Sequence, residues 1–144
     1  MTSGNVGDQG QHAAQDRSAG LVVATMAGAL VIFGVMLAVL GAELATPEAW
    51  MLAAVAVFTL LSWGLVRFLP PPPGAPQAGA VMPLVVLRAA ILEAPAMIGI
   101  GLAFAADPPN LLVYLLPAMF ALAGLWMFAR PSVVRSHLDK ARAR

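Results

Sequence analysis

The sequence predicts an all-α polytopic membrane protein, with four antiparallel transmembrane helices in a bundle and a short amphipathic helix at the C-terminus. The 144-residue chain is 60% hydrophobic and only 10% charged, whereas soluble domains carry about 25% charged residues. Four apolar runs are each about long enough to cross a bilayer core, which takes roughly 20 residues. They lie at about 20–44, 49–69, 83–105 and 110–129.

The residues before the first run, 1–18, are rich in Gly, Gln, Asp and Ser, a composition typical of disordered chain. They lack the basic start and short apolar core of a cleavable signal peptide, so we expect the first span to be retained. The chain divides into a disordered segment 1–18, a four-helix transmembrane domain 19–130 and a basic tail 131–144.

The first span carries a stripe of small residues at alternating steps of four and three, interrupted by Val31. Small residues at this spacing allow another helix backbone to approach closely. The neighbour could be a helix of the same chain or of a second copy, and the pattern does not decide between them. The stripe consists of Gly20, Ala24, Ala27, Gly34, Ala38 and Gly41.

A proline-rich connection follows the second span, with four consecutive prolines at 70–73. Proline ends a helix and favours an extended, semi-rigid spacer. We interpret the segment as a linker, with recognition by a proline-reading partner as the alternative.

The third span contains Arg88, Glu93 and Pro95 among apolar residues. Glu93 lies near the middle of the span, where an ionised carboxylate costs at least about 2.5 kcal/mol on insertion scales. Five helical residues separate the Arg88 and Glu93 side chains by about 140°, which disfavours an ion pair between them. Arg88 is long enough to reach the inner interface or an aromatic ring such as Trp63.

Glu93 therefore needs water, a proton or a partner. Pro95 frees the carbonyl of Ile91 and allows a kink, and Thr59 of the second span lies at a similar depth. A protonated Glu93 could donate to either group. Two interpretations stay open: Glu93 takes up and releases a proton or small cation, or it is a polar residue that fixes helix packing.

Charge distribution predicts the orientation. Basic residues follow the fourth span, whereas the two loops expected outside carry only acidic charges. The positive-inside rule then places both termini in the cytoplasm. In the tail, Val134 and Leu138 share one face among the basic residues, as in a helix lying on an anionic membrane surface; a docking arm is the alternative. The basic residues of this surface are Arg130, Arg135, Lys140, Arg142 and Arg144.

The aromatic residues indicate where the spans meet the membrane interfaces. Trp50 and Tyr114 fall near the outer boundary and Trp126 near the inner one, as in an aromatic belt.

The stretch "LRAAILEAPAMIGIGLAFA", residues 87–105, resembles the carboxyl-bearing helix of the rotary ATP synthase proteolipid. We reject that identification, because the carboxyl lies in the third span and the first span lacks a dense glycine repeat. The chain also resembles small bacterial four-helix membrane proteins without an assigned activity. This resemblance implies a membrane location and a bundle, and it carries no mechanism. Small multidrug exporters differ, since their membrane glutamate lies in the first span.

The composition also narrows the function classes. The spans offer no histidine and no aspartate pair, and the chain has no cysteine, so we expect no enzyme activity, no cofactor and no metal. A net charge of +1 disfavours nucleic acid as a partner. We expect a plasma-membrane protein in contact with the lipid bilayer, acting as an accessory, assembly or interaction component with a membrane protein partner or a second copy. The alternative is a small proton- or cation-coupled transporter that uses Glu93.

Overall fold

The computed structural model describes residues 5–69 and 81–142. It confirms the predicted all-α bundle: four long apolar helices pack against one another, and a short helix follows them. These helices are α1 (Asn5–Val39), α2 (Ala49–Phe68), α3 (Val81–Ala105), α4 (Leu111–Phe128) and α5 (Pro131–Arg142). Each of the first four contains a stretch long and apolar enough to cross a membrane.

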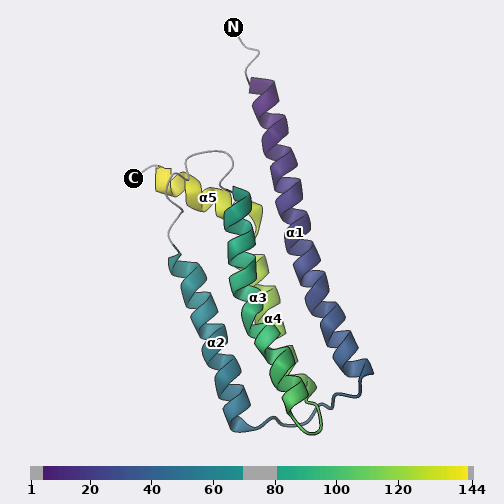
Figure 1. Cartoon of the computed structure of the whole chain (residues 1–144). Coiled ribbons are helices and arrows are strands. Elements are labelled where there is room, and N and C mark those ends of the chain that lie inside the picture. The colour runs from purple at the N-terminus through teal and green to yellow at the C-terminus, as the bar shows by residue number, and fades with distance from the viewer. Residues whose placement is uncertain (1–4, 70–80, 143–144) are drawn as a thin grey trace.

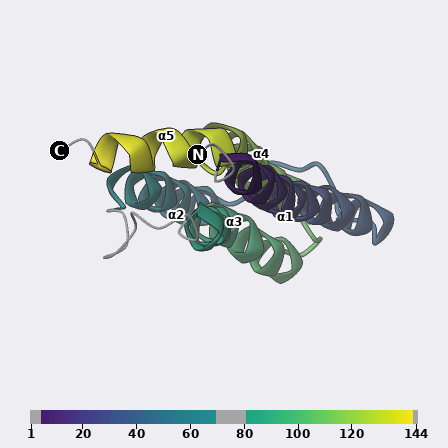
Figure 2. The same ribbon diagram turned by 90° about the horizontal axis from the view of Figure 1, so that it is seen from above.

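The central pair of the bundle is α3 and α4, which share the most extensive contact, while α1 and α2 pack against both of them. Figure 1 shows the four helices running alternately down and up, and Figure 2, seen from above, places α1 and α2 at opposite edges. Only 11% of the apolar stretch of α1 and 22% of that of α2 is buried, against 44% for α3 and for α4. The two edge helices therefore present most of their apolar surface to the membrane.

The start of α1 differs from the sequence prediction. Residues 5–18 are helical rather than disordered, so α1 projects beyond the other helices (Figure 1). Extending a helix that is already nucleated costs little per residue, and this segment contains no proline. It is also held in place, because Asp16 forms an ion pair with Arg135 of α5 at 2.8 Å.

The end of α1 also differs from the prediction, because the helix stops at Val39 instead of continuing to residue 44. Gly41 has a positive φ of 85°, a conformation that glycine adopts without a steric penalty. The N–H groups of Gly41 and Ala42 donate to the carbonyls of Ala38 and Leu37, the pattern of a Schellman C-cap. Gly41 is therefore a helix terminator and not part of a packing face.

The two short loops at the end opposite α5 are joined to each other. The N–H of Glu43 donates to the Pro109 carbonyl at 2.8 Å, and the N–H of Leu111 donates to the Glu43 carbonyl at 2.9 Å. Asn110 is 5% exposed. Its Oδ1 accepts a hydrogen bond from the N–H of Leu112 and so caps α4. Its Nδ2 donates to the Ala45 carbonyl at 3.0 Å. These bonds tie the entry of α4 to the α1–α2 connection.

The amphipathic α5 packs on protein. Its apolar residues Val134 and Leu138 are 0% and 4% exposed, and they form a cluster with Ala19 of α1 and Leu84 and Val85 of α3. The prediction that this apolar face inserts into the membrane surface is therefore wrong for these two side chains, because the ends of α1 and α3 cover it. The side chains of Lys140 and Arg142, Arg144 and the prolines at 70–73 lie outside what the structure describes.

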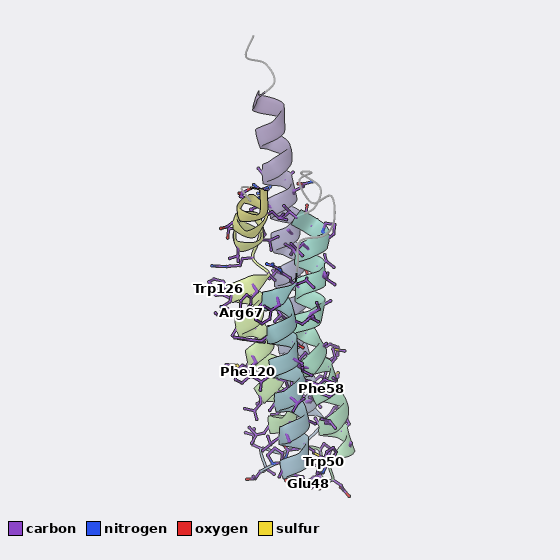
Figure 3. All side chains as sticks on the ribbon, turned by 90° about the vertical axis from the view of Figure 1, so that its left-hand side faces the viewer. Glu48, Trp50, Phe58, Arg67, Phe120 and Trp126 are labelled. Carbon is purple, nitrogen blue, oxygen red and sulfur yellow. The ribbon has the colours of Figure 1, made fainter. Side chains whose placement is uncertain are left out.

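Side chains at the two ends of the bundle fit a membrane-spanning orientation. Figure 3 shows Trp50 and Glu48 at the loop end and Trp126 and Arg67 toward the α5 end. Trp50 Nε1 donates a hydrogen bond to the Glu48 carboxylate. The two tryptophans are 54% and 64% exposed, as expected of interfacial aromatic residues.

Candidate functional site

Glu93 is the central residue of α3, about 18 Å from each end of the helix at 1.5 Å per residue. It is half-buried. It shares a face of α3 with Met82, which packs in the cluster that contains Ala19 of α1. The carboxyl also lies within electrostatic range of Tyr114. Glu93 thus sits at mid-depth of α3, half-buried.

Within the described part of the chain, Glu93 makes no hydrogen bond and no ion pair. No ion pair joins Arg88 and Glu93 among the described residues. Pro95 is fully buried inside α3, and the helix continues through it. Pro95 removes the hydrogen bond that the Ile91 carbonyl would otherwise accept, but Glu93 does not donate to that carbonyl.

Thr59 does not partner Glu93. Its hydroxyl is buried and has no hydrogen-bond partner. Thr59 instead lines an apolar groove of about 520 Å³ between α2 and α4, together with Trp63 and Phe120. Thr59 faces this groove with residues of α4, and no hydrogen bond joins it to Glu93 among the described residues.

Arg88 lies inside the bundle, 3% exposed, and not along the lipid face or on an aromatic ring. Its Nη1 donates to the Phe128 carbonyl at the end of α4, at 3.2 Å. The carbonyls of a last helical turn lack intrahelical donors and attract a positive charge. Because α4 has no basic residue in its own last turn, Arg88 supplies that charge from α3. Its Nε has no partner.

Tyr114 is buried rather than interfacial, which corrects its assignment to the aromatic belt. It is 1% exposed, and its hydroxyl donates to the Leu30 carbonyl of α1. Gly34, one turn further along α1, makes room for the ring: a Cβ at Gly34 would lie 3.3 Å from Tyr114 Cε1. This contact joins α1 to α4 beside Glu93. The glycine in the small-residue stripe was the sequence signal for it.

Two glycines allow a close approach between α3 and α4, and the sequence did not predict this feature. A Cβ at Gly99 would lie 2.8 Å from Pro117 Cγ and 2.9 Å from the Val113 carbonyl oxygen. Pro117 itself frees that carbonyl, because its ring nitrogen carries no hydrogen. Gly124 of α4 is in a similar position, with its missing Cβ 2.7 Å from Leu92 Cδ2.

The small-residue stripe of α1 does not form the main packing face of this helix. The most buried residues of α1 lie outside the stripe and are Ala19, Leu30 and Leu37, at most 2% exposed. Ala24 and Ala38 are exposed, while Gly20, Ala27 and Gly34 are half-buried. These five positions border grooves between α1 and α4.

Potential metal ligands do not gather anywhere in the described residues: no group of three or more His, Cys, Asp or Glu side chains is found. The chain matches no known protein family, no curated protein and no solved structure.

Proposed function

We propose that this chain is a noncatalytic interaction or assembly component of a plasma-membrane complex. The observation that supports this proposal is Glu93, which lies half-buried at the centre of α3 without a hydrogen bond or ion pair in the described chain. An ionised carboxylate at that depth costs at least about 2.5 kcal/mol. A donor on a neighbouring membrane helix would offset this cost.

The surface beside Glu93 can accept such a helix. Val86, Met97 and Phe104 lie within about 40° of Glu93 around α3, by the periodicity of the helix. They are 39%, 50% and 47% exposed, so the edge that carries Glu93 borders the membrane. A partner helix with a Lys, Arg, Ser, Thr or Asn near mid-depth could pack on these side chains and bond the carboxyl.

The charge distribution supports cytoplasmic termini for this proposal. Arg67, Arg130 and Arg135 belong to the α5 end of the bundle, whereas Glu43 and Glu48 belong to the opposite loops. Cytoplasmic loops carry the excess of Lys and Arg in membrane proteins.

Chemical cross-linking in native membranes tests the proposal, because the chain contains no cysteine. A single Met97→Cys variant carrying a photoreactive group should capture one partner in stoichiometric amounts. In that background, Glu93→Gln should weaken capture by about 3-fold to 18-fold, the equivalent of one interhelical hydrogen bond of about 0.6–1.7 kcal/mol. Glu43→Gln, in an exposed loop, is the matched control and should leave capture unchanged. Equal capture by both variants would refute the role of Glu93.

The second candidate is a small proton- or cation-coupled transporter. It is favoured by the position of Glu93 at the centre of α3, since an ionisable residue inside a membrane span marks ion or proton pathways in pumps and transporters. Liposomes that contain only this protein would then dissipate a pH gradient, and Glu93→Gln would abolish the flux. Such flux without any partner would contradict the first proposal.

A further inference from the structure

A groove of about 650 Å³ runs between α1 and α4 in the half of the bundle nearest α5. Its walls are almost entirely apolar, and one basic residue stands at its end. The α1 side is built from Gly20, Val23, Ala24 and Ala27, and three of these four residues are glycine or alanine, so the floor of the groove there lies close to the helix backbone. The residues that matter here are Gly20, Ala24, Ala27, Leu122, Trp126 and Arg130.

The depth of this groove corresponds to one leaflet. From Gly20 to Ala27 the α1 wall extends about 10 Å, while one half of a hydrocarbon core is about 15 Å thick. A second groove of about 330 Å³ continues between the same helices toward the loop end and shares Leu122 with the first. The larger volume therefore lies in the half nearest α5, where Trp126 and Arg130 line the groove. One charge beside an otherwise apolar lining matches an anionic lipid, whose headgroup stays at the interface while its acyl chain lies in the apolar part.

Arg130 supplies charge at the entrance. Its Cζ lies 3.1 Å from the centre of the Trp126 ring, and the residue is half-buried. It forms no ion pair with any described carboxylate. A guanidinium stacked on an aromatic face keeps its N–H edge free, and this edge matches the geometry of a phosphate. Trp126 marks the interfacial depth at which phospholipid headgroups lie.

We propose that this groove binds one anionic phospholipid from the leaflet at the α5 end. Arg130 holds the phosphate, Trp126 fixes the guanidinium, and an acyl chain lies over Ala24 and Ala27. This site is separate from the Glu93 edge of α3, so it stands whether or not the interaction function is correct. It also explains why the stripe of α1 remains open instead of packing against another helix of the chain.

Native mass spectrometry of the purified full-length protein tests the site. The protein is prepared in mild detergent with either phosphatidylglycerol or phosphatidylcholine. Wild type should retain one phosphatidylglycerol and little phosphatidylcholine. Arg130→Gln should lower phosphatidylglycerol retention about tenfold, as expected for one hydrogen bond to a charged group. The matched control is Arg67→Gln, an exposed arginine at the same end of the bundle (Figure 3), which should retain lipid like wild type.

A second pair of variants tests the role of the groove without changing Arg130. Ala27→Leu fills it and should reduce retention of the lipid, whereas Ala90→Leu, on an exposed position of α3, should not. Circular dichroism and the elution volume verify that each variant is folded. Retention unchanged by both Arg130→Gln and Ala27→Leu would overturn the proposal. So would efficient disulfide cross-linking of two Ala27→Cys chains in phosphatidylglycerol membranes, because the groove would then be an interface between copies.

Discussion

Replacement of Gly99 by alanine should destabilise the bundle at the contact between α3 and α4. The new Cβ would lie 2.8 Å from Pro117 Cγ and 2.9 Å from the Val113 carbonyl oxygen, whereas ordinary contacts begin at 3.4 Å. The two helices would have to separate locally by about 0.6 Å. Neither neighbour can rotate away, since one is backbone and the other a ring within a helix. Overpacking of this kind costs about 1–3 kcal/mol.

Alanine also has a better helix propensity than glycine, by about 0.5–1 kcal/mol. We therefore expect Gly99→Ala to lower the free energy of unfolding by about 1–2 kcal/mol, measured by SDS titration in mixed micelles with helical circular dichroism as the signal. Gly101→Ala is the matched control on the same helix, because nothing lies within 4 Å of its Cβ position. It should be neutral or slightly stabilising. Equal transitions for the two variants would refute the close approach of α3 and α4.

Three further variants test individual contacts. Arg88→Leu removes a charged hydrogen bond and a buried charge, effects of similar size. The free energy of unfolding should change by less than about 1 kcal/mol, while the amides in the last turn of α4 exchange faster, and unchanged exchange there would contradict the capping role. Asn110→Ala should lower the free energy of unfolding in SDS titration by about 1–3 kcal/mol, because it removes the α4 cap and a loop hydrogen bond. Asn110→Asp keeps the cap and should lower this free energy less. Tyr114→Phe should lower the free energy of unfolding by about 0.6–1.7 kcal/mol in the same titration, the range for hydrogen bonds between membrane helices. An unchanged free energy of unfolding would mean that the hydrogen bond from Tyr114 to α1 is absent.

The positions of the spans could be predicted from sequence because a bilayer imposes one dominant requirement, a continuous apolar helix of sufficient length. The predicted bounds of α2 agree with the structure to within one residue. The prediction for α1 failed at both ends for different reasons. Hydropathy gives no information on the backbone conformation of Gly41, whose positive φ ends the helix. Composition likewise gives no information on the ion pair between Asp16 and Arg135, which lie far apart in the sequence.

The packing of the helices could not be predicted in the same way. A stripe of small residues is visible in α1, but alanine is frequent throughout the chain. The glycines that allow the closest approach are Gly99 and Gly124, and their importance depends on what lies opposite each of them. That information is absent from the periodicity of a single helix.

Arg88 and Glu93 show how differently two charges on one membrane helix can be accommodated. Both stand on α3, five residues apart. The side chain of Arg88 is long enough to reach the end of α4, where the Phe128 carbonyl is available to it. Glu93 is shorter, lies at mid-depth and finds no such group in the described chain. Since the cost of an unpartnered carboxylate rises with depth, Glu93 is the residue for which a proton or a partner matters most. A function that depends on charge at mid-depth of the bundle should therefore respond to Glu93→Gln, whereas lipid binding at the α5 end should respond to Arg130→Gln.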